Sequence, residues 1–500
     1  MRRFVTLALV ALALASCGGP DARPRRDPPP NERTRVEVVA VPAQQSPPES
    51  GPPRDIDFPD VVTATTSSGL ATNTVRFGDL PVVYLRLVVR TGGAADPAEL
   101  PGLAHFVSQM LKEGTQTRTS AQLAEAVEFL GAELDVGDDE ENVYVMVRAL
   151  TDHLDAAMEL LADVARNPRF SDSELRRLKA REHDRLRLLA QQPHHLARRT
   201  LYAELYGAHP YARIDTTPAA VDRVRRTDLV RWHGQHLVPN NTLLIAVGNV
   251  DPSAVQQSAE RHFGRWRSRP VRRLTYPSPP TRTERQVVIV DRPSSQQSTI
   301  FVGNLALARN APTFVRLEVA NQVLGGSAAS RLFMDLREQR SLTYGAYSQV
   351  AERAQVAPFV AFARVRNQVT AEAVAGLFEH LDRIVAEAPP AEELANAQRY
   401  LSDSFPLQIE TAARIGHMVQ QLRVFDLPED YWDTYRSSIR GVTPADAHGA
   451  AQAYIQPDRA LIVAVGRAAD IAEPLRRYGP VRIIDTNGRV ASTLAQQAAE

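Results

Sequence analysis

The sequence has very little cysteine and no excess of charge of either sign. Its 500 residues contain one cysteine, and 58 Lys and Arg are balanced by 58 Asp and Glu. One cysteine can form neither a disulfide within the chain nor a multi-cysteine metal site. Proteins that bind nucleic-acid phosphates carry a basic excess or a basic stripe, so the balanced charge argues against nucleic acid as a partner.

Long hydrophobic runs are also missing. The apolar run Phe4 to Ala15 follows the basic start Met1-Arg2-Arg3. About a dozen residues are too few to span a bilayer, which takes about 20, but they suit the apolar region of a secretory signal peptide. No later stretch reaches the length of a membrane span, so we expect contact with a membrane through a lipid anchor only.

The single cysteine lies at the end of this run. The segment Leu14-Ala15-Ser16-Cys17-Gly18 resembles a bacterial lipobox, in which the cysteine is lipidated and becomes the first residue of the mature protein. The alternative is an ordinary secretory signal with an incidental cysteine. The resemblance predicts a lipoprotein signal peptide over 1–16 and lipidation of Cys17. It implies a location in the cell envelope, and Gly18 favours the outer membrane, facing the periplasm.

Proline is concentrated in the segment that follows. Eleven of the 35 prolines lie between residues 18 and 60, among Gly, Ser, Arg and Asp. Such a segment cannot bury a hydrophobic core. We therefore expect a Pro-rich, disordered tether over 17–60, before the folded part of the chain.

The folded part contains an internal repeat. The segments 239–248 and 457–466 each place a turn before an apolar run that ends in glycine, and similar helical patterns flank both. Several features repeated at nearly one offset indicate a duplication. We expect an N-terminal domain over 61–275, a C-terminal domain over 281–480 and a tail over 481–500.

Strand and helix patterns are mixed in each half, which predicts an α+β fold. In the first half we expect strands over Val82–Arg90 and Asn142–Ala149, and helices over Leu154–Asn167 and Asp172–Gln191. In the second half we expect strands over Gln286–Asp291 and Pro358–Arg364, and helices over Ala371–Ala388 and Ala391–Ser404.

One segment resembles a known catalytic helix. Residues 101–115 read PGLAHFVSQMLKEGT and are similar to the zinc helix of the pitrilysin/insulinase family, bacterial two-domain branch. That family carries the inverted motif H-x-x-E-H, in which two histidines four residues apart bind Zn²⁺ from one helix face and the glutamate acts as general base.

The resemblance also shows what has changed at this site. The motif positions hold His105, Ser108 and Gln109, and counting on to the family's third ligand leads to Arg185. A serine cannot act as a base near neutral pH, and a fixed cation opposes Zn²⁺. We therefore expect a degenerate motif with no intact catalytic residues, no metal ligands and no cofactor in this chain. His105 alone would then be a helix histidine without a catalytic role.

The second half contains a better-preserved match. Residues 324–344 read LGGSAASRLFMDLREQRSLTY and resemble the family's C-terminal domain, where a Gly-Gly turn leads into a helix and then a strand. The resemblance makes Arg337 and Tyr344 the family's substrate-binding pair. The alternative is a surface ion pair of Arg337 with Glu338 or Asp335, and a tyrosine in the core. Arg331 is expected to support the fold.

The resemblance implies a fold and a function. The fold would be two homologous α/β-sandwich domains of the LuxS/peptidase-like metalloprotease type, forming half of a clam-shell chamber. The function would be that of a non-catalytic, substrate-binding subunit of a heterodimeric zinc metalloendopeptidase that acts on unfolded peptides outside the cytoplasm. Its partner would be a sister subunit with an intact H-x-x-E-H motif, which would hold the Zn²⁺.

Two alternatives remain open from the sequence. One is an active metallopeptidase with altered metal ligands around His105, Glu182 and His183. The other is a scaffold or binding protein that kept the peptidase fold without a proteolytic role.

Overall fold

The computed structural model describes residues 56–272 and 274–496. The expected signal peptide over 1–16, Cys17, and the expected tether as far as residue 55 lie outside these residues. In the described part of the chain, no helix is long and apolar enough to cross a membrane.

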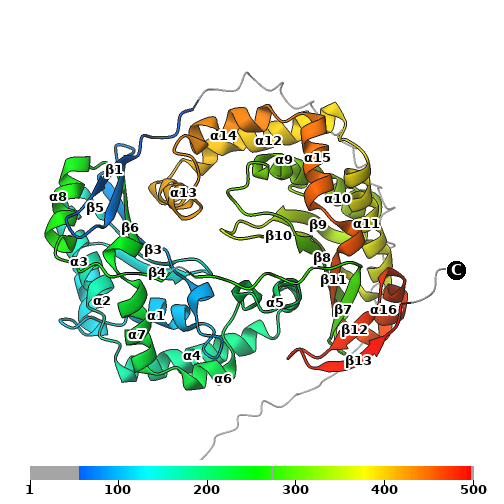
Figure 1. The fold of residues 1–500 in the computed structure, drawn as a ribbon, viewed down its shortest axis with the longest axis horizontal. Helices are drawn as coiled ribbons and strands as arrows, with labels where there is room; N and C mark the ends of the chain where they lie inside the picture. The colour runs from blue at the N-terminus through cyan, green and yellow to red at the C-terminus, as the bar shows by residue number, and fades with distance from the viewer. Residues whose placement is uncertain (1–55, 273, 497–500) are drawn as a thin grey trace, which may run out of the picture. The chain divides into compact units, whose positions relative to one another are not determined.

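The first half of the described chain forms one sheet with helices (Figure 1). The strand order is β1-β2-β6-β3-β5-β4, in which only β2 and β6 run parallel. Its strands are β1 Val62–Thr65, β2 Ala71–Arg76, β3 Val82–Val89, β4 Glu133–Asp138, β5 Val143–Leu150 and β6 Thr242–Gly248. Its helices are α1 Leu103–Leu111, α2 Ser120–Phe129, α3 Leu154–Arg166, α4 Asp172–Leu189, α5 Pro193–Tyr206, α6 Pro218–Arg223, α7 Arg226–His236 and α8 Pro252–Phe263.

The second half forms another sheet, in the order β13-β12-β7-β11-β8-β10-β9. Its strands are β7 Gln286–Asp291, β8 Gln297–Leu305, β9 Thr343–Val350, β10 Pro358–Arg366, β11 Leu461–Gly466, β12 Val481–Ile484 and β13 Val490–Leu494. Its helices are α9 Phe314–Leu324, α10 Arg331–Phe333, a π-helix over Met334–Gln339, α11 Thr370–Ala386, α12 Ala391–Gln408, α13 Ala412–Val424, α14 Tyr431–Arg440, α15 Pro444–Tyr454 and α16 Ala468–Leu475.

The two sheets share one topology, which confirms the duplication. The order β2-β6-β3-β5-β4 of the first sheet returns in the second as β7-β11-β8-β10-β9. The repeated segments form equivalent strands, because each follows a short 3₁₀ turn and lies between a parallel and an antiparallel neighbour. Strand β6 pairs parallel with β2 and antiparallel with β3, and β11 pairs in the same way with β7 and β8. The α+β fold class is confirmed as well, and each strand and helix expected from the sequence is present within a few residues of its predicted bounds.

The expected tail over 481–500 differs from the structure. Val481–Ile484 forms β12, which pairs parallel with β7, and Val490–Leu494 forms β13 beside it. The four residues of β12 are too few to show an alternating pattern in the sequence, but Val481 and Ile484 are buried. The second sheet therefore extends to residue 494.

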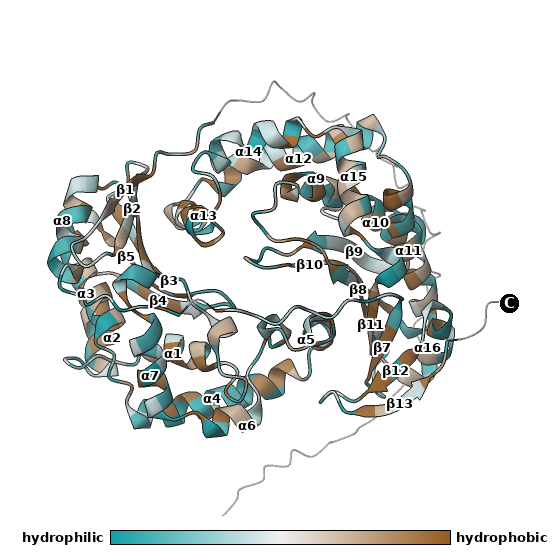
Figure 2. Cartoon of the chain, viewed as in Figure 1, coloured by the Kyte–Doolittle hydropathy of each residue, from teal (hydrophilic) through white to brown (hydrophobic). Residues whose placement is uncertain are grey.

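The hydrophobic core covers both faces of each sheet. One face of the first sheet packs against α1, α3, α7 and α8 of its own half, and one face of the second packs against α9, α11, α15 and α16. In Figure 2 the strands β7, β11 and β12 are largely brown, whereas α8 is largely teal. This alternation of apolar strands and polar outer helices is what an α+β layer structure requires.

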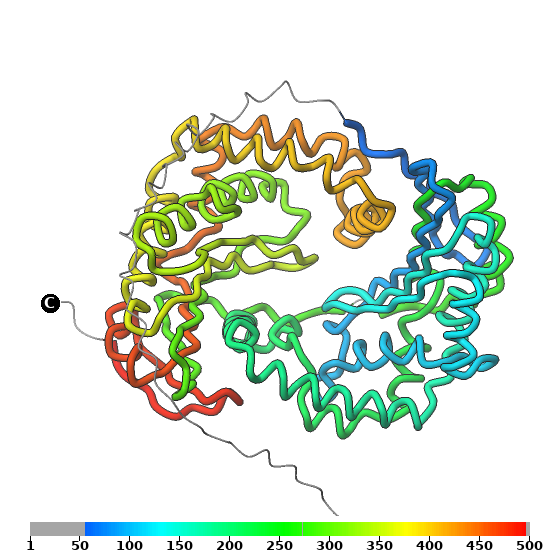
Figure 3. Tube along the Cα trace, turned by 180° about the vertical axis from the view of Figure 1, so that it is seen from behind, coloured from blue at the N-terminus to red at the C-terminus, as the bar shows by residue number. Residues whose placement is uncertain are grey.

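The other face of each sheet is covered by a helix from the opposite half. Helix α5 of the first half packs on β8 and β11 through Leu196, Leu201 and Leu205. Helix α13 of the second half packs on β3 and β6 through Ile415 and Val419. Figures 1 and 3 show α13 beside the first sheet and α5 beside the second. The two halves thus exchange one helix each.

Candidate functional site

Helix α1, the expected zinc helix, has its start fixed by Asp96. The backbone N–H groups of Gly102 and Ala104 donate to the two carboxylate oxygens of Asp96, at 2.8 and 2.9 Å. Gly102 has a φ of 88°, and a Cβ there would lie 2.5 Å from the Cβ of Thr216. Burial raises the pKa of Asp96 to about 7, although the two N–H groups favour its charged form. The start of α1 is therefore firmly held.

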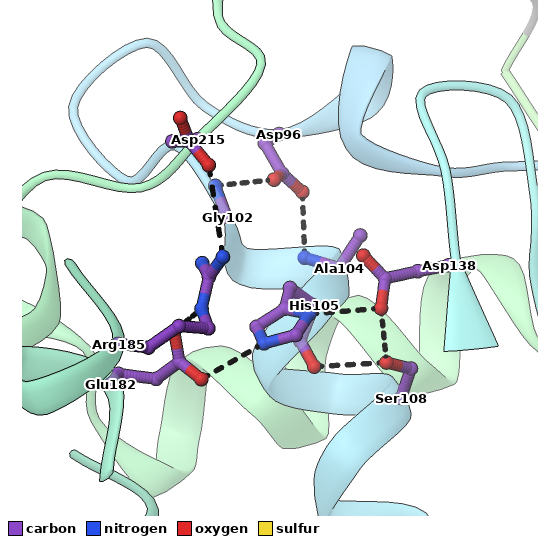
Figure 4. A network of polar contacts seen from close by, with 9 residues as sticks. All are labelled: Asp96, Gly102, Ala104, His105, Ser108, Asp138, Glu182, Arg185 and Asp215. Atoms are coloured by element: carbon purple, nitrogen blue, oxygen red, sulfur yellow. Dashed lines mark hydrogen bonds and ion pairs between the residues drawn. The ribbon is translucent and has the colours of Figure 1, made fainter. Parts of the chain in front are cut away.

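His105 on α1 lies between two carboxylates (Figure 4). Its Nδ1 is 3.0 Å from Asp138 Oδ1, at the end of β4, and its Nε2 is 3.1 Å from Glu182 Oε1 on α4. Burial alone would disfavour the imidazolium, but the hydrogen bonds to both carboxylates outweigh it and raise the pKa of His105 to about 9. His105 is therefore a cation at neutral pH, with both ring nitrogens engaged.

The other two motif positions hold Ser108 and Gln109, and neither can act as a general base. Ser108 is fully buried, and its Oγ lies 2.6 Å from Asp138 Oδ1 and 3.0 Å from the carbonyl oxygen of His105. Gln109 lies one turn after His105, and its amide forms no hydrogen bond with any described residue. Ser108 thus helps to position Asp138, and no residue of this turn stands free to act as a base.

Arg185 belongs to the same network. Its Nε donates to Glu182 Oε2 at 2.7 Å, and its Nη1 lies 3.7 Å from Asp215 Oδ1. The other oxygen of Asp215 lies 2.7 Å from Nε2 of the buried His195. Although burial opposes it, hydrogen bonding from His105 and Arg185 lowers the pKa of Glu182. Acidic and basic groups thus alternate along one network from Asp138 through to His195.

These residues do not fit a catalytic zinc ion. Catalytic zinc takes three protein ligands with one position left open, whereas Asp138 and Glu182 lie at opposite nitrogens of one imidazole. The guanidinium of Arg185 holds the second oxygen of Glu182. Among the residues that the structure describes, no group of three or more His, Cys, Asp or Glu side chains could hold a metal ion.

The three residues considered as altered metal ligands, His105, Glu182 and His183, do not all lie together. His105 and Glu182 are in contact, but His183 faces away, with its Nε2 2.9 Å from Asp222 Oδ1. Consecutive helical residues point about 100° apart, so Glu182 and His183 cannot share a face of α4. Counting from Gln109 leads to Arg185, and the structure instead places Glu182, one helical turn earlier, against His105.

Arg337 and Tyr344 belong to the second half and are accessible. The guanidinium of Arg337 lies 4.7 Å above the ring of Phe333, and its Nε is 3.3 Å from Glu338 Oε1, so the ion pair considered as the alternative role does form. Tyr344 lies on β9, the edge strand of its sheet, and is 88% exposed, so it is not a core residue. Asp335 is already held by Arg340 and His380.

The turn that contains Arg337 is not an ordinary α-helix. After the three residues of α10, the chain forms a π-helix over Met334–Gln339, in which the N–H of Arg340 donates to the carbonyl of Asp335 at 2.9 Å. Single π turns are rare and occur frequently at functional sites. Gly325 precedes this segment, and a Cβ there would lie 2.5 Å from the backbone nitrogen of Ser348. The Gly-Gly turn therefore packs directly on β9.

Sequence reasoning missed three residues of the network, Asp96, Asp138 and Asp215. Asp138 begins the acidic run Asp138-Asp139-Glu140-Glu141, and that run was a signal available in the sequence. Asp96 and Asp215 lie in irregular segments, and their partners are distant in the chain, so no local pattern identifies them.

Comparison with known proteins agrees with this architecture. A model described as insulinase (peptidase family M16) matches residues 79–218, and one described as peptidase M16 inactive domain matches residues 223–401. An uncharacterized zinc protease of Mycobacterium leprae is 28% identical over 295 residues, which cover 58% of this chain and 65% of that protein. The uncharacterized zinc protease YmxG of Bacillus subtilis is 22% identical over 330 residues, covering 66% and 80%.

Solved structures show the same fold. A peptidase M16 inactive domain from Pseudomonas fluorescens superposes with a TM-score of 0.77 at 24% identity, covering 82% of this chain and 98% of that one. A protease from Helicobacter pylori gives 0.76 at 16% identity, covering 81% and 99%. Fold and sequence together define a two-domain, peptidase-type α+β protein. The chain belongs to the pitrilysin/insulinase family, in its two-domain bacterial branch.

Proposed function

We propose that the chain is the non-catalytic, substrate-binding subunit of a heterodimeric zinc metalloendopeptidase that acts on unfolded peptides outside the cytoplasm. Its partner is a sister subunit with an intact H-x-x-E-H motif, and that subunit holds the Zn²⁺, its ligands and the general base. This chain holds no cofactor of its own.

One observation carries the proposal. His105, the retained motif histidine, has Asp138 at one ring nitrogen and Glu182 at the other. A ligand nitrogen needs a free lone pair, and the raised pKa of His105 keeps both nitrogens protonated at neutral pH. With serine in place of the base, the site supports a structural role in this chain.

The accessible Arg337 and Tyr344 support a part in substrate binding. A guanidinium and a phenol both donate hydrogen bonds, and such donors suit peptide carbonyls and a developing oxyanion. Among the described residues, Arg337 has only its sequence neighbour Glu338 as an ion-pair partner, and Tyr344 is 88% exposed. A scaffold protein has no need of this exposed pair, so their accessibility favours the substrate-binding role.

The proposed location rests on the amino-terminal sequence. A lipidated Cys17 would place the protein in the cell envelope, with the Pro-rich segment 17–60 as the tether. We propose the periplasmic face of the outer membrane. Labelling with a radioactive fatty acid tests this, because Cys17→Ala should abolish incorporation of the label, and incorporation retained in that variant would contradict the proposal.

Activity is tested with the chain alone and with its partner. Alone, the purified chain should contain no stoichiometric zinc by elemental analysis and cleave no unfolded peptide. Chelator-sensitive cleavage by the chain alone would instead support the altered-ligand peptidase. The sister subunit is sought as an H-x-x-E-H protein that co-purifies with this chain, and if the combined proteins show no cleavage, the scaffold alternative is favoured.

Two variants test the substrate-binding pair in the combined proteins. Arg337→Ala and Tyr344→Phe should each lower the rate about 10- to 100-fold, because each removes a donor used in the transition state. Arg231→Ala, an exposed arginine on α7, is the control and should leave the rate unchanged. Unchanged rates in all three variants would remove the role given to Arg337 and Tyr344.

A further inference from the structure

A polar cavity lies in the second half, behind the π-helix that carries Arg337. It has a volume of about 720 Å³, within the range of small-molecule sites. Four elements line it, namely the end of α9, the segment from Ser327 to Arg340, α11 and α12. Arg337 and Tyr344 are not among the lining residues, so this cavity is separate from the proposed substrate-binding pair.

The cavity wall carries an amide that no described residue pairs. Gln322 is only 6% exposed, lines the cavity, and its side chain forms no hydrogen bond with any described residue. A Cβ on Gly326 would lie 2.3 Å from Gln322 Oε1, so glycine at that position leaves the amide in place. The amide is thus held at the cavity wall with its hydrogen-bonding capacity unused.

Among the charged residues that line the cavity, the carboxylates are paired, whereas some guanidinium N–H groups have no partner among the described residues. Arg331, with its side chain 7% exposed, gives Nε and Nη2 to Glu393 Oε2 at 2.7 and 2.6 Å, while its buried Nη1 has no partner among the described residues. Asp335 is held by His380 and Arg340.

The remaining wall charges follow the same pattern. Glu379 is also paired with Arg340, so every wall carboxylate is already engaged. Within the described part of the chain, Arg383 at the wall reaches only Glu387, which is 3.8 Å away and does not line the cavity.

We propose that this cavity binds a small ligand through a carboxylate, of the kind that ends a short peptide. The Gln322 amide and the guanidinium of Arg383 would donate to the carboxylate oxygens, since a guanidinium and an amide suit a carboxylate. The partly exposed Met334 and Tyr400 give an apolar rim for the rest of the ligand. The proposal does not depend on pairing with a catalytic subunit.

Binding is tested on the whole chain by calorimetry, with N-acetyl-Ala-Ala as the probe and its C-terminal amide as the comparison. The free acid should bind at least tenfold more tightly than the amide, and acetate should compete with it. Equal binding of acid and amide, or no saturable binding of the acid up to millimolar concentration, would overturn the proposal. Inorganic phosphate competing better than acetate would also overturn it, because the site would then be for phosphate.

Variants locate the binding. Gln322→Leu and Met334→Trp should each weaken binding of the acid at least tenfold, the first by removing a donor and the second by filling the mouth. These changes avoid Arg331, whose loss would leave Glu393 without its partner. Arg316→Ala, on the same helix α9 as Gln322 but outside the cavity, should bind as the native protein does. Unchanged binding in both cavity variants, with native thermal unfolding, would refute this location.

Discussion

Glu182 on α4 accepts a hydrogen bond from His105 Nε2 at 3.1 Å with one oxygen and from Arg185 Nε at 2.7 Å with the other. One buried carboxylate thus lies between two cations that come from different helices. The packing of α1 on α4 therefore depends on charge as well as on apolar contact.

Stability should change with pH because of His105. Its pKa is raised from 6.5 in the unfolded chain to about 9 in the folded protein, so its contribution is fully present below pH 6.5 and is lost as the pH rises through about 9. The advantage of the native protein over His105→Gln should therefore shrink, by on the order of 2 kcal/mol, between pH 6 and pH 9.5. Urea unfolding at several pH values measures it, and a constant difference would contradict the raised pKa.

Removing the Glu182 carboxylate should destabilise the protein strongly. Glu182→Ala leaves His105 and Arg185 without their shared partner, and breaking a buried ion pair costs about 3–5 kcal/mol. The matched control is Asp184→Ala, which breaks the exposed pair with Arg187 at the same spacing on the same helix. The control should lose less than about 1 kcal/mol. Equal losses by chemical denaturation would mean that the buried network adds nothing.

Glu318 on α9 should also make the stability of the protein depend on pH. Burial raises the pKa of Glu318 to about 7, and its Oε1 accepts a hydrogen bond from Tyr435 at 2.8 Å. A carboxyl with a raised folded pKa contributes stability below its unfolded pKa, near 4.5, and loses it as the pH rises through about 7. Glu318→Gln should therefore gain relative to the native protein, by on the order of 3 kcal/mol, between pH 4.5 and pH 8.5. Thermal unfolding at both pH values measures this, and a gain at the lower pH would have the wrong sign.

Replacing Gly416 on α13, the helix that packs on the first sheet, should lower the stability of the protein. A Cβ there would lie 2.8 Å from Cε1 of the buried Tyr84 on β3, so Gly416→Ala should push the helix from the sheet and cost about 1–3 kcal/mol. Gly449→Ala on α15 meets nothing within 4 Å and should instead gain about 0.5–1 kcal/mol from helix propensity. Comparing the two unfolding midpoints tests the close packing, which a stabilised Gly416→Ala would contradict.

Much of the fold could be predicted from local patterns. The repeated apolar runs ending at Gly248 and Gly466 identify the central strands, because such strands are buried on both faces and read as continuous apolar runs. The short β12 escapes prediction because its place depends on pairing with β7, nearly 200 residues earlier in the chain. The π-helix that contains Arg337 has no signal in the spacing of the sequence.

The candidate site was less predictable than the fold. The sequence locates His105, Ser108 and Gln109 on one helix, but the partners of His105 come from β4 and α4. Counting from Gln109 to the expected third ligand assumes a fixed number of residues between the two helices. A difference of three residues leads to Glu182 in place of Arg185, and these two side chains have opposite charges. Because the partners in this network are far apart in the sequence, only the folded structure identifies them.

The exchange of α5 and α13 bears on how a chain of this kind can arise. One unit by itself would leave an apolar sheet face bare, so two separate copies would have to trade helices, as in a domain-swapped dimer. Joining the copies end to end makes that trade internal and independent of concentration. Each half can then accumulate different substitutions, such as those around His105 in one and Tyr344 in the other, while the shared cover keeps both folded.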